Sequence, residues 1–211
     1  MSGRTIVHLL RHGEVHNPEG ILYGRLPGYR LSERGRAMAD LAAAHLAGRD
    51  VTVLASSPME RAQETAAPLV AQFGVPLRID DRLIEAKNAF EGQRFSAAKL
   101  AAPAMWPRLF NPWRPSWGEP YVQIAGRMRA VVEAARVAAR GHEAVLVSHQ
   151  LPIEILRRFV EGERLWHDPR NRRCQLASVT SLEYDGDNLQ SVVYAEPAWS
   201  LYPGATEVPG A

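Results

Sequence analysis

The sequence predicts an α/β fold, a three-layer α/β/α arrangement in which a mostly parallel sheet lies between helices. Apolar runs of strand length alternate with helical patterns along most of the chain, which is typical of parallel sheets covered on both faces. The last two apolar runs flank a turn motif, which indicates an antiparallel edge strand. The 211 residues suffice for one sizeable core, so we expect a single domain over residues 1–211.

The first three elements are a strand, a helix and a second strand. The apolar run at residues 5–10 predicts the first strand of the sheet. Ser32 is a favourable N-cap for a helix that reaches about Ala47, where Gly48 ends it. The apolar run at residues 51–54 predicts the second strand.

The second helix carries a clear start signal. Ser57 and Glu60 have the spacing of a capping box, and Pro58 occupies the first helical position. This helix is expected to reach about Phe73 and to end at Gly74.

The remaining elements follow in the same alternating order, and the chain closes with a hairpin around an Asp-Gly-Asp-Asn turn. We expect strands at 77–79 and 145–148, helices at about 121–140 and 152–160, and hairpin strands at 178–184 and 189–195.

Two segments stand outside this pattern. Residues from about 93 to 120 form an insert rich in tryptophan, phenylalanine and proline, for which we expect short helices over the carboxyl ends of the strands. This insert is either a small satellite core or an aromatic lid that shapes a ligand site or an interface. The tail, about residues 197–211, is rich in proline and glycine and is expected to be extended.

Composition excludes several classes of protein. The net charge of +2 is too small to argue for nucleic-acid binding. Cys174 is the single cysteine, so neither an intrachain disulfide nor a thiolate metal cluster is expected. No apolar run approaches the ~20 residues of a membrane span, and the amino terminus lacks a secretory apolar segment. We therefore expect a cytoplasmic protein that binds no membrane.

Charged and titratable side chains follow three of the expected strands. Arg11 and His12 follow the first strand, and His149 follows the run at 143–148. Arg61 lies one turn into the helix after the second strand. Ligands of open α/β sheets bind where the carboxyl ends of the strands meet. Two guanidinium and two imidazole groups at this edge predict a pocket for a phosphoryl group, because guanidinium groups bind its oxygens bidentately.

The two histidines are expected to have different roles. Positive neighbours disfavour protonation of His12, which leaves a neutral ring nitrogen able to attack phosphorus. His149 is expected to be the protonated partner that binds the phosphoryl oxygens.

Three motifs then carry a resemblance that covers nearly the whole chain. Leu10-Arg11-His12-Gly13-Glu14 resembles the amino-terminal motif of the histidine phosphatase superfamily, the phosphoglycerate mutase-like fold. The segment Ser56-Ser57-Pro58-Met59-Glu60-Arg61-Ala62-Gln63-Glu64-Thr65-Ala66 is similar to the second motif of that family, and Val147-Ser148-His149 resembles the third.

The resemblance implies a phosphatase without a metal or other cofactor. His12 would become phosphorylated, while Arg11, Arg61 and His149 clamp the transferred group. The family also uses a carboxylic acid that protonates the leaving oxygen and then activates water, and Glu85 occupies that place in this sequence.

The chain also departs from the family pattern. The loop after Glu85 is one residue shorter than in many members, which leaves Glu14 and Glu91 as alternative acids. Asn17 lies one position early for its phosphate contact, and Gln150 stands where glycine is frequent. Asn17, Gln150 and Glu14 are expected to contact the substrate in addition to the clamp.

Other interpretations stay open beside the phosphatase. A phosphoglycerate mutase would use the same pocket but return the phosphoryl group to the substrate, and a non-catalytic protein would only bind phosphorylated ligands. His8, His12 and His16 have the spacing of a helical zinc site, but the strand pattern and Pro18 argue against a helix there. We expect a small phosphomonoester as substrate, and a homodimer is compatible with the sequence.

A basic cluster near the carboxyl-terminal hairpin completes the candidate residues. Arg170, Arg172 and Arg173 are expected to form a solvated loop rather than a second anion site.

Overall fold

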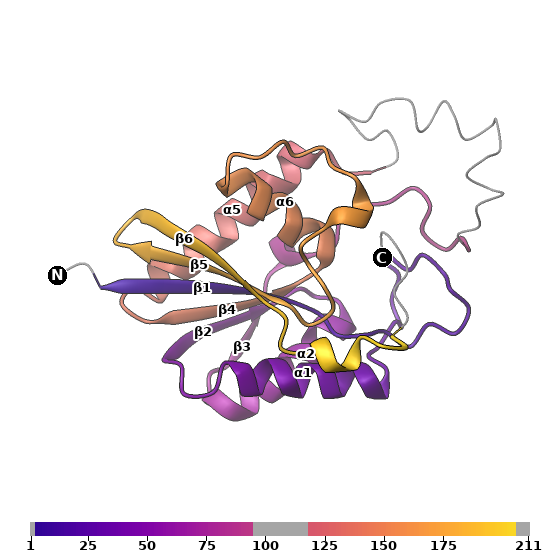
Figure 1. Ribbon diagram of the computed structural model, residues 1–211, viewed down its shortest axis with the longest axis horizontal. Helices are drawn as coiled ribbons and strands as arrows, with labels where there is room; N and C mark the ends of the chain where they lie inside the picture. The colour runs from indigo at the N-terminus through magenta and orange to yellow at the C-terminus, as the bar shows by residue number, and fades with distance from the viewer. Residues whose placement is uncertain (1–2, 95–117, 206–211) are drawn as a thin grey trace.

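The computed structural model describes residues 3–94 and 118–205, and the described chain forms a three-layer α/β/α fold (Figure 1). The sheet has six strands in the order β3-β2-β4-β1-β5-β6. Neighbours among β1 to β4 pair in parallel, whereas β5 is antiparallel to both β1 and β6. The predicted fold class is therefore confirmed, with an antiparallel pair at one edge. The strands are β1 (Arg4–Arg11), β2 (Val51–Ser56), β3 (Leu77–Ile79), β4 (Glu143–Ser148), β5 (Val179–Asp185) and β6 (Asn188–Ala195).

Two pairs of helices cover the two faces of the sheet (Figure 1). Side chains alternate along the strands, so successive residues enter different cores. Leu9 and Leu146 pack with the residues of α5 and α6, whereas Leu10 and Val147 pack with those of α1 and α2. The helices are α1 (Glu33–His45), α2 (Glu60–Phe73), α5 (Tyr121–Ala138) and α6 (Gln150–Val160), with 3-10 turns η1 (Asp81–Leu83), η3 (Pro169–Asn171) and η4 (Trp199–Leu201).

The start of α2 differs from the predicted capping box. The helix begins at Glu60, and its N-cap, Met59, makes no side-chain capping hydrogen bond. The two capping-box side chains are engaged elsewhere: Ser57 Oγ lies 2.7 Å from Nε2 of His149, and the Glu60 carboxylate accepts from the backbone N–H of Gly28 at 3.0 Å. Contacts with distant loops have replaced the local cap.

The sequence predicts two irregular segments, the insert at about residues 93–120 and the tail at about residues 197–211. The insert falls mostly on residues 95–117, which lie outside the described residues. The tail is not extended where it is described, because Trp199–Leu201 form a 3-10 turn. Ala198 is fully buried, and the hydroxyl of Tyr202 donates to the carbonyl of Leu176 at 3.1 Å, so contacts with the body of the fold hold this segment.

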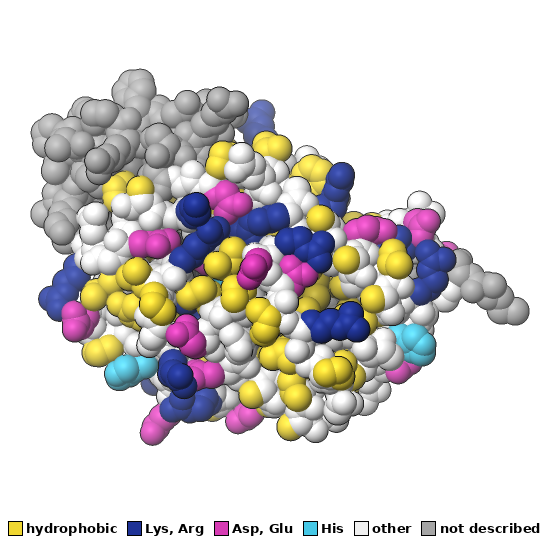
Figure 2. Space-filling view, turned by 180° about the vertical axis from the view of Figure 1, so that it is seen from behind, with side chains coloured by type: hydrophobic (Ala, Val, Ile, Leu, Met, Phe, Trp, Pro, Cys, Tyr) yellow, Lys and Arg dark blue, Asp and Glu magenta, His cyan; other side chains and the backbone are white. Residues whose placement is uncertain are grey.

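The surface shows no concentration of one charge on the face drawn in Figure 2, where basic and acidic side chains are interspersed. Within the described ranges, no helix is long and apolar enough to cross a membrane.

Close backbone packing joins the loop after β1 to the start of α1. Ser32 caps α1 as predicted, since its hydroxyl accepts from the N–H of Gly35 at 2.9 Å. A Cβ added at Gly13 would lie 2.4 Å from the carbonyl oxygen of Gly35, and one at Gly35 would lie 2.0 Å from that of Glu14. Neither glycine has a positive φ, so the lack of a side chain, rather than a special turn, is what the fold requires here.

Replacing Gly35 by alanine should therefore destabilise the protein. The new methyl group would push the two loops apart, and such overpacking costs about 1–3 kcal/mol of the free energy of unfolding. The matched control is Gly126→Ala, an exposed position inside α5 with no heavy atom within 4 Å of the added Cβ. That change should stabilise the protein by roughly 0.5–1 kcal/mol. Urea denaturation measures both, and equal stability of Gly35→Ala and the wild type would contradict this packing argument.

Candidate active site

The carboxyl ends of β1 and β4 bring the two candidate histidines together. Arg11 ends β1 and pairs in register with Ser148, the last residue of β4. His12 and His149 follow these two positions directly, and their ring centroids lie 5.2 Å apart. Arg61 reaches the same place from the first turn of α2, which follows the neighbouring strand β2. The side chains of Arg11, His12, Arg61 and His149 are all fully buried.

The backbone selects the tautomer of His12. Its Nδ1 lies 2.8 Å from the carbonyl oxygen of Gly13. A carbonyl oxygen only accepts, so Nδ1 carries the proton and Nε2 carries a lone pair. That Nε2 is buried and has no hydrogen-bond partner among the described residues. It has the state that a nucleophile requires.

Burial, together with positively charged neighbours, favours the neutral form of this ring. Burial lowers the pKa of His12 well below its ordinary value, and the positive charges of Arg61 and Arg11 lower it further. The hydrogen bond to Gly13 opposes this shift without reversing it. The neutral ring nitrogen expected from the sequence is thus consistent with the structure.

Arg61 presents donors that the described protein does not satisfy. Its Nη2 donates to the carbonyl of Gly24 at 2.6 Å, and its guanidinium group lies over the ring of Tyr23, 4.7 Å from the centroid. Its Nε and Nη1 are buried and reach no acceptor within residues 3–94 and 118–205. Buried donors without acceptors are rare in native proteins. They indicate that a ligand with oxygen acceptors completes the site.

The protonation of His149 differs from the expectation. Its Nδ1 lies 3.3 Å from Nη2 of Arg61, which can only donate, so Nδ1 accepts and Nε2 carries the proton that faces Ser57 Oγ. Burial lowers the pKa of His149 well below its ordinary value, and Arg61 and His12 lower it further. Burial first and the neighbouring positive charges second therefore favour a neutral ring in the free protein.

Arg11 and Gln150 share one backbone acceptor. Nη1 of Arg11 donates to the carbonyl of Cys174 at 2.7 Å, and Nε2 of Gln150 donates to the same oxygen at 3.3 Å. The segment before β5 therefore fixes the guanidinium group of Arg11 at the end of β1. Cys174 itself is buried, which raises the pKa of its thiol to about 12.

Glu85 has the properties of a proton donor. It follows η1 after β3, and its side chain is only 3% exposed. Its Oε1 accepts from the N–H of Ala86 at 2.7 Å. Burial raises the pKa of Glu85, although the hydrogen bond from Ala86 and the charges of Arg61 and Arg172 oppose the rise. Burial is the largest of these causes, so the protonated acid is favoured relative to an exposed glutamate.

Two alternative carboxylates are engaged in structural contacts. Glu14 accepts from the hydroxyl of Ser32 and from Nη1 of Arg34 at 3.2 Å, and so holds its loop to the start of α1. Oε1 of Glu91 accepts from the N–H of Asn88 at 3.2 Å. Neither contact favours the role that the sequence left open for these two residues as alternative acids.

Asn17 closes its own loop. Its Nδ2 donates to the carbonyl of Ile21 at 2.8 Å, and its Oδ1 accepts from the N–H of Ile21 at 3.1 Å. The expected substrate contact of Asn17 is left with the second N–H of this amide.

The three histidines with helical spacing lie in different surroundings. His8 is buried between Ser181 Oγ at 2.7 Å and Glu143 Oε2 at 2.8 Å, and His16 is exposed. Among the residues that the structure describes, no group of three or more His, Cys, Asp or Glu side chains is arranged to hold a metal ion.

Sequence reasoning missed several residues around the site. Tyr23 and Gly24 contact Arg61 from a loop that carries no motif, and Ser57 was assigned only a capping role. Arg172 was assigned to a solvated loop, but its guanidinium group is half-buried and bonds Gln150 and His167. These contacts join segments far apart in the chain, which no local pattern reveals.

Comparisons with known proteins agree with this geometry. A family model for the histidine phosphatase superfamily (branch 1) matches residues 7–197. The chain is 56% identical to an uncharacterised protein of Mycobacterium tuberculosis over 200 residues, 94% of this chain and 99% of that protein. It is similar to the solved structure of mycobacterial glucosyl-3-phosphoglycerate phosphatase, with 27% identity and a TM-score of 0.71, over 91% of this chain and 96% of that chain. A shorter match, 41% identical over 81 residues, covers 38% of this chain and 40% of a 2,3-bisphosphoglycerate-dependent phosphoglycerate mutase of Thermoplasma acidophilum.

The tautomers of the two site histidines can be measured directly. In the ligand-free protein, nitrogen-15 NMR of the side chains should show His12 protonated on Nδ1 and His149 on Nε2. As the pH falls, both rings should stay neutral well below the pH at which an ordinary histidine takes up a proton, because burial and nearby arginines lower the pKa of both rings. Protonation of His12 at the pH of an ordinary histidine, about 6.5, or a proton on Nε2 of His12 in the neutral ring, would contradict the proposed state of the site.

Proposed function

The chain belongs to the histidine phosphatase superfamily, and from that premise we propose that it is a metal-independent phosphomonoester hydrolase acting through a phosphohistidine on His12. Glu85 serves as the proton donor and later as the base. Arg11, Arg61 and His149 bind the transferred phosphoryl group. The substrate is a small phosphomonoester.

One observation carries this proposal. The lone pair on Nε2 of His12 and two N–H donors of Arg61 are buried in the same site without partners among the described residues. A phosphoryl group satisfies both, because its phosphorus accepts the lone pair and its oxygens accept the N–H groups. Guanidinium groups thus supply the positive charge that a metal ion provides in other phosphoryl-transfer sites.

In the first step, Nε2 of His12 attacks phosphorus while the bond from phosphorus to the leaving oxygen breaks. The proton of Glu85 passes to that oxygen, so the product leaves as a neutral alcohol. Negative charge on the three remaining phosphoryl oxygens is stabilised by donors already in place. Loss of one such donor costs on the order of 2.7–4 kcal/mol of the activation barrier.

In the second step, a water molecule attacks the phosphorus of phosphohistidine. The ionised carboxylate of Glu85 takes a proton from this water, and the phosphorus–nitrogen bond breaks. Inorganic phosphate is released, and the lone pair returns to Nε2 of His12. Acid and base are the same group in its two protonation states, which a glutamate with a raised pKa can supply near neutral pH.

A mutase is the second candidate. The similarity to the phosphoglycerate mutase supports it, although the matched segment covers only 38% of this chain. The broader similarity to a phosphatase structure, over 91% of this chain, favours hydrolysis. A mutase would transfer the phosphoryl group from His12 to a second hydroxyl group instead of to water.

Replacing His12 by alanine should abolish the covalent intermediate. With a radioactive phosphomonoester and rapid quenching, the wild type should carry an acid-sensitive phosphate at no more than one per chain, and the variant none; kcat of the variant should fall by at least about 10³-fold. His16→Ala is the matched control and should keep full activity, because His16 is exposed outside the pocket. Chelators should leave the wild-type activity unchanged. Equal labelling of the wild type and His12→Ala would overturn the role of His12.

Replacing Glu85 by glutamine should separate the two steps. With alkyl phosphates, kcat should fall by about 10²–10⁴-fold, because the leaving oxygen lacks its proton donor. With p-nitrophenyl phosphate the leaving group needs little protonation, so one equivalent of nitrophenol should appear in a burst while phosphohistidine accumulates. Glu91→Gln is the control for loss of a nearby carboxylate and should show no burst.

The pH dependence gives a further check on Glu85. Since the acid form is required for the first step, kcat/KM of the wild type for alkyl phosphates should fall as the pH rises through the raised pKa of Glu85. The glutamine variant should lose this alkaline limb. Persistence of the limb in the variant would mean that another group donates the proton.

The destination of the radioactive phosphoryl group distinguishes a hydrolase from a mutase. A hydrolase releases labelled phosphate at the same rate with or without added phosphoglycerate. Transfer of the label to phosphoglycerate in preference to water would favour the mutase.

A further inference from the structure

Arg172 lies beside the phosphoryl site, on a loop between α6 and β5. Its Nη1 donates to Oε1 of Gln150 at 2.8 Å, and its Nε donates to Nε2 of His167 at 3.0 Å. Gln150 directly follows His149 and shares the carbonyl of Cys174 with Arg11. Arg172 is therefore joined to the site through a continuous chain of hydrogen bonds.

The acceptors that hold Arg172 are neutral. Nδ1 of His167 faces the carbonyl of Leu165 at 2.8 Å and must donate to it, so Nε2 of His167 accepts from Arg172 and the ring is uncharged. Gln150 offers an amide oxygen. Nη2 of Arg172 donates to no acceptor within the described part of the chain, and none of the ion pairs found there includes Arg172.

Neighbouring arginines behave differently. Arg170, two residues earlier, is exposed and pairs with Asp168 at 2.6 Å. Arg157 and Arg158 both pair with the buried carboxylate of Glu154. Arg172 thus differs from nearby arginines in being half-buried and bonded only to neutral groups, and a buried positive charge is costly unless an anion accompanies it.

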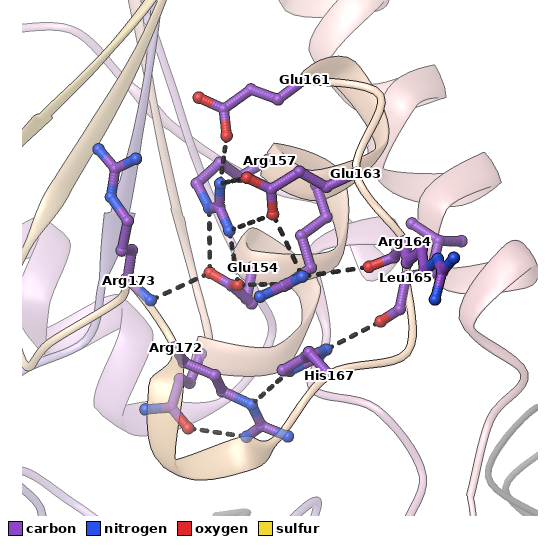
Figure 3. A network of polar contacts seen from close by, with 11 residues as sticks. Glu154, Arg157, Glu161, Glu163, Arg164, Leu165, His167, Arg172 and Arg173 are labelled. Carbon is purple, nitrogen blue, oxygen red and sulfur yellow. Dashed lines mark hydrogen bonds and ion pairs between the residues drawn. The ribbon is translucent and has the colours of Figure 1, made fainter.

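The loop is fixed before any ligand binds. Glu154 is fully buried in α6 and accepts from the backbone N–H of Arg173, as well as from Arg157 and Arg158 (Figure 3). The carbonyl of Cys174 accepts from Arg11 on the other side. Residues on the carboxyl side of Arg172 are therefore anchored at two points, which lowers the entropy lost when the guanidinium group binds a ligand.

Contacts around the start of α5 place Arg172 on the same side of the site as Glu85. Arg172 donates to His167, whose ring centroid lies 6.0 Å from that of Tyr121 at the start of α5. Arg25 joins the residues just before α5 to Glu85, because it donates to the carboxylate of Glu119 at 3.0 Å and to the backbone carbonyl of Glu85 at 2.6 Å.

In agreement with this placement, the charge of Arg172 opposes the rise in the pKa of Glu85, the group that faces the leaving oxygen in the proposed mechanism. In the proposed mechanism the transferred phosphoryl group meets Nε2 of His12 and the unsatisfied donors of Arg61, and Arg172 is not part of that set. An anion bound by Arg172 therefore belongs to the alcohol portion of the substrate.

We propose that Arg172 is a specificity-determining residue that binds a second anionic group, a carboxylate or a second phosphate, on the alcohol portion of the phosphomonoester substrate. This inference rests on the proposed function, because it assigns the leaving-group side by the position of Glu85. It replaces the expectation that the cluster of Arg170, Arg172 and Arg173 is only a solvated loop.

Three substrates with one carbon skeleton test this assignment. Glycerol 1-phosphate has a neutral hydroxymethyl end, 3-phosphoglycerate has a carboxylate there, and glycerol 1,3-bisphosphate has a second phosphate. In Arg172→Gln, kcat/KM should fall by about 10- to 100-fold for the anionic substrates and by less than about 2-fold for glycerol 1-phosphate. The larger fall among the two anionic substrates identifies the preferred anion.

The matched control is Arg170→Gln, which removes an exposed arginine from the same loop and should change none of the three values by more than about 2-fold. An equal fall for all three substrates in Arg172→Gln would mean a structural or phosphoryl-binding role and would overturn the proposal. An unchanged set of values would overturn it as well.

The affinities of the same three compounds separate this proposal from the proposed function. Calorimetry in a His12→Ala background, compared with His12→Ala/Arg172→Gln, measures binding without turnover. If the wild type hydrolyses none of the compounds, the proposed phosphatase activity fails on these substrates. Arg172 is then judged on binding alone, and a loss of affinity confined to the anionic compounds would still support the second anion site.

Discussion

The hydrogen bond from Nδ1 of His12 to the carbonyl of Gly13 is the interaction on which the rest of the site depends. A neutral imidazole carries one proton, so an acceptor at Nδ1 leaves the lone pair on Nε2. The backbone supplies this acceptor in place of a carboxylate. The position of that carbonyl depends in turn on close packing, since Gly13 touches the backbone at Gly35 where a methyl group would not fit. The approach of α1 to the loop after β1 thus determines which nitrogen can attack phosphorus.

Burial and positive charge act differently on the acid and the base of this site. Both lower the pKa of His12 and keep its lone pair available. For Glu85 they oppose each other, because burial raises the pKa while Arg61 and Arg172 lower it. Positive charge alone would favour the ionised carboxylate, so the deep burial of Glu85 is what favours its protonated form, as the proposed role of proton donor requires. The unsatisfied buried donors of Arg61 destabilise the free protein, and a bound oxyanion would remove that penalty.

The sequence predicts well which residues meet at the strand ends, because Arg11, His12 and His149 lie where an apolar run ends. The register of two neighbouring parallel strands positions Arg11, His12 and His149. Both strands can be predicted from local apolar runs in the sequence. Prediction from local sequence patterns fails where a side chain contacts residues that are distant in the sequence. The capping box of α2 is absent because Ser57 faces His149, and the half-buried position of Arg172 depends on residues about 20 positions away, such as Gln150. Local patterns report periodicity and caps, whereas these contacts arise only from the packed fold.

The two sides of the proposed site are built from different kinds of structural element. The phosphoryl end is built from strand ends and one helix start, elements whose geometry a common sheet imposes. The leaving-group side is built from loops, and loops vary without disturbing the sheet. Arg172 belongs to this second part, yet it is not a freely moving loop residue, because buried Glu154 holds the adjacent backbone of Arg173 to α6. A buried ion-pair network far from the chemistry therefore has a reason to exist here: it fixes a guanidinium group where the alcohol portion of the substrate would lie. Under this proposal, substrate choice would depend on how firmly α6 holds that loop, and not on the residues proposed to carry out phosphoryl transfer.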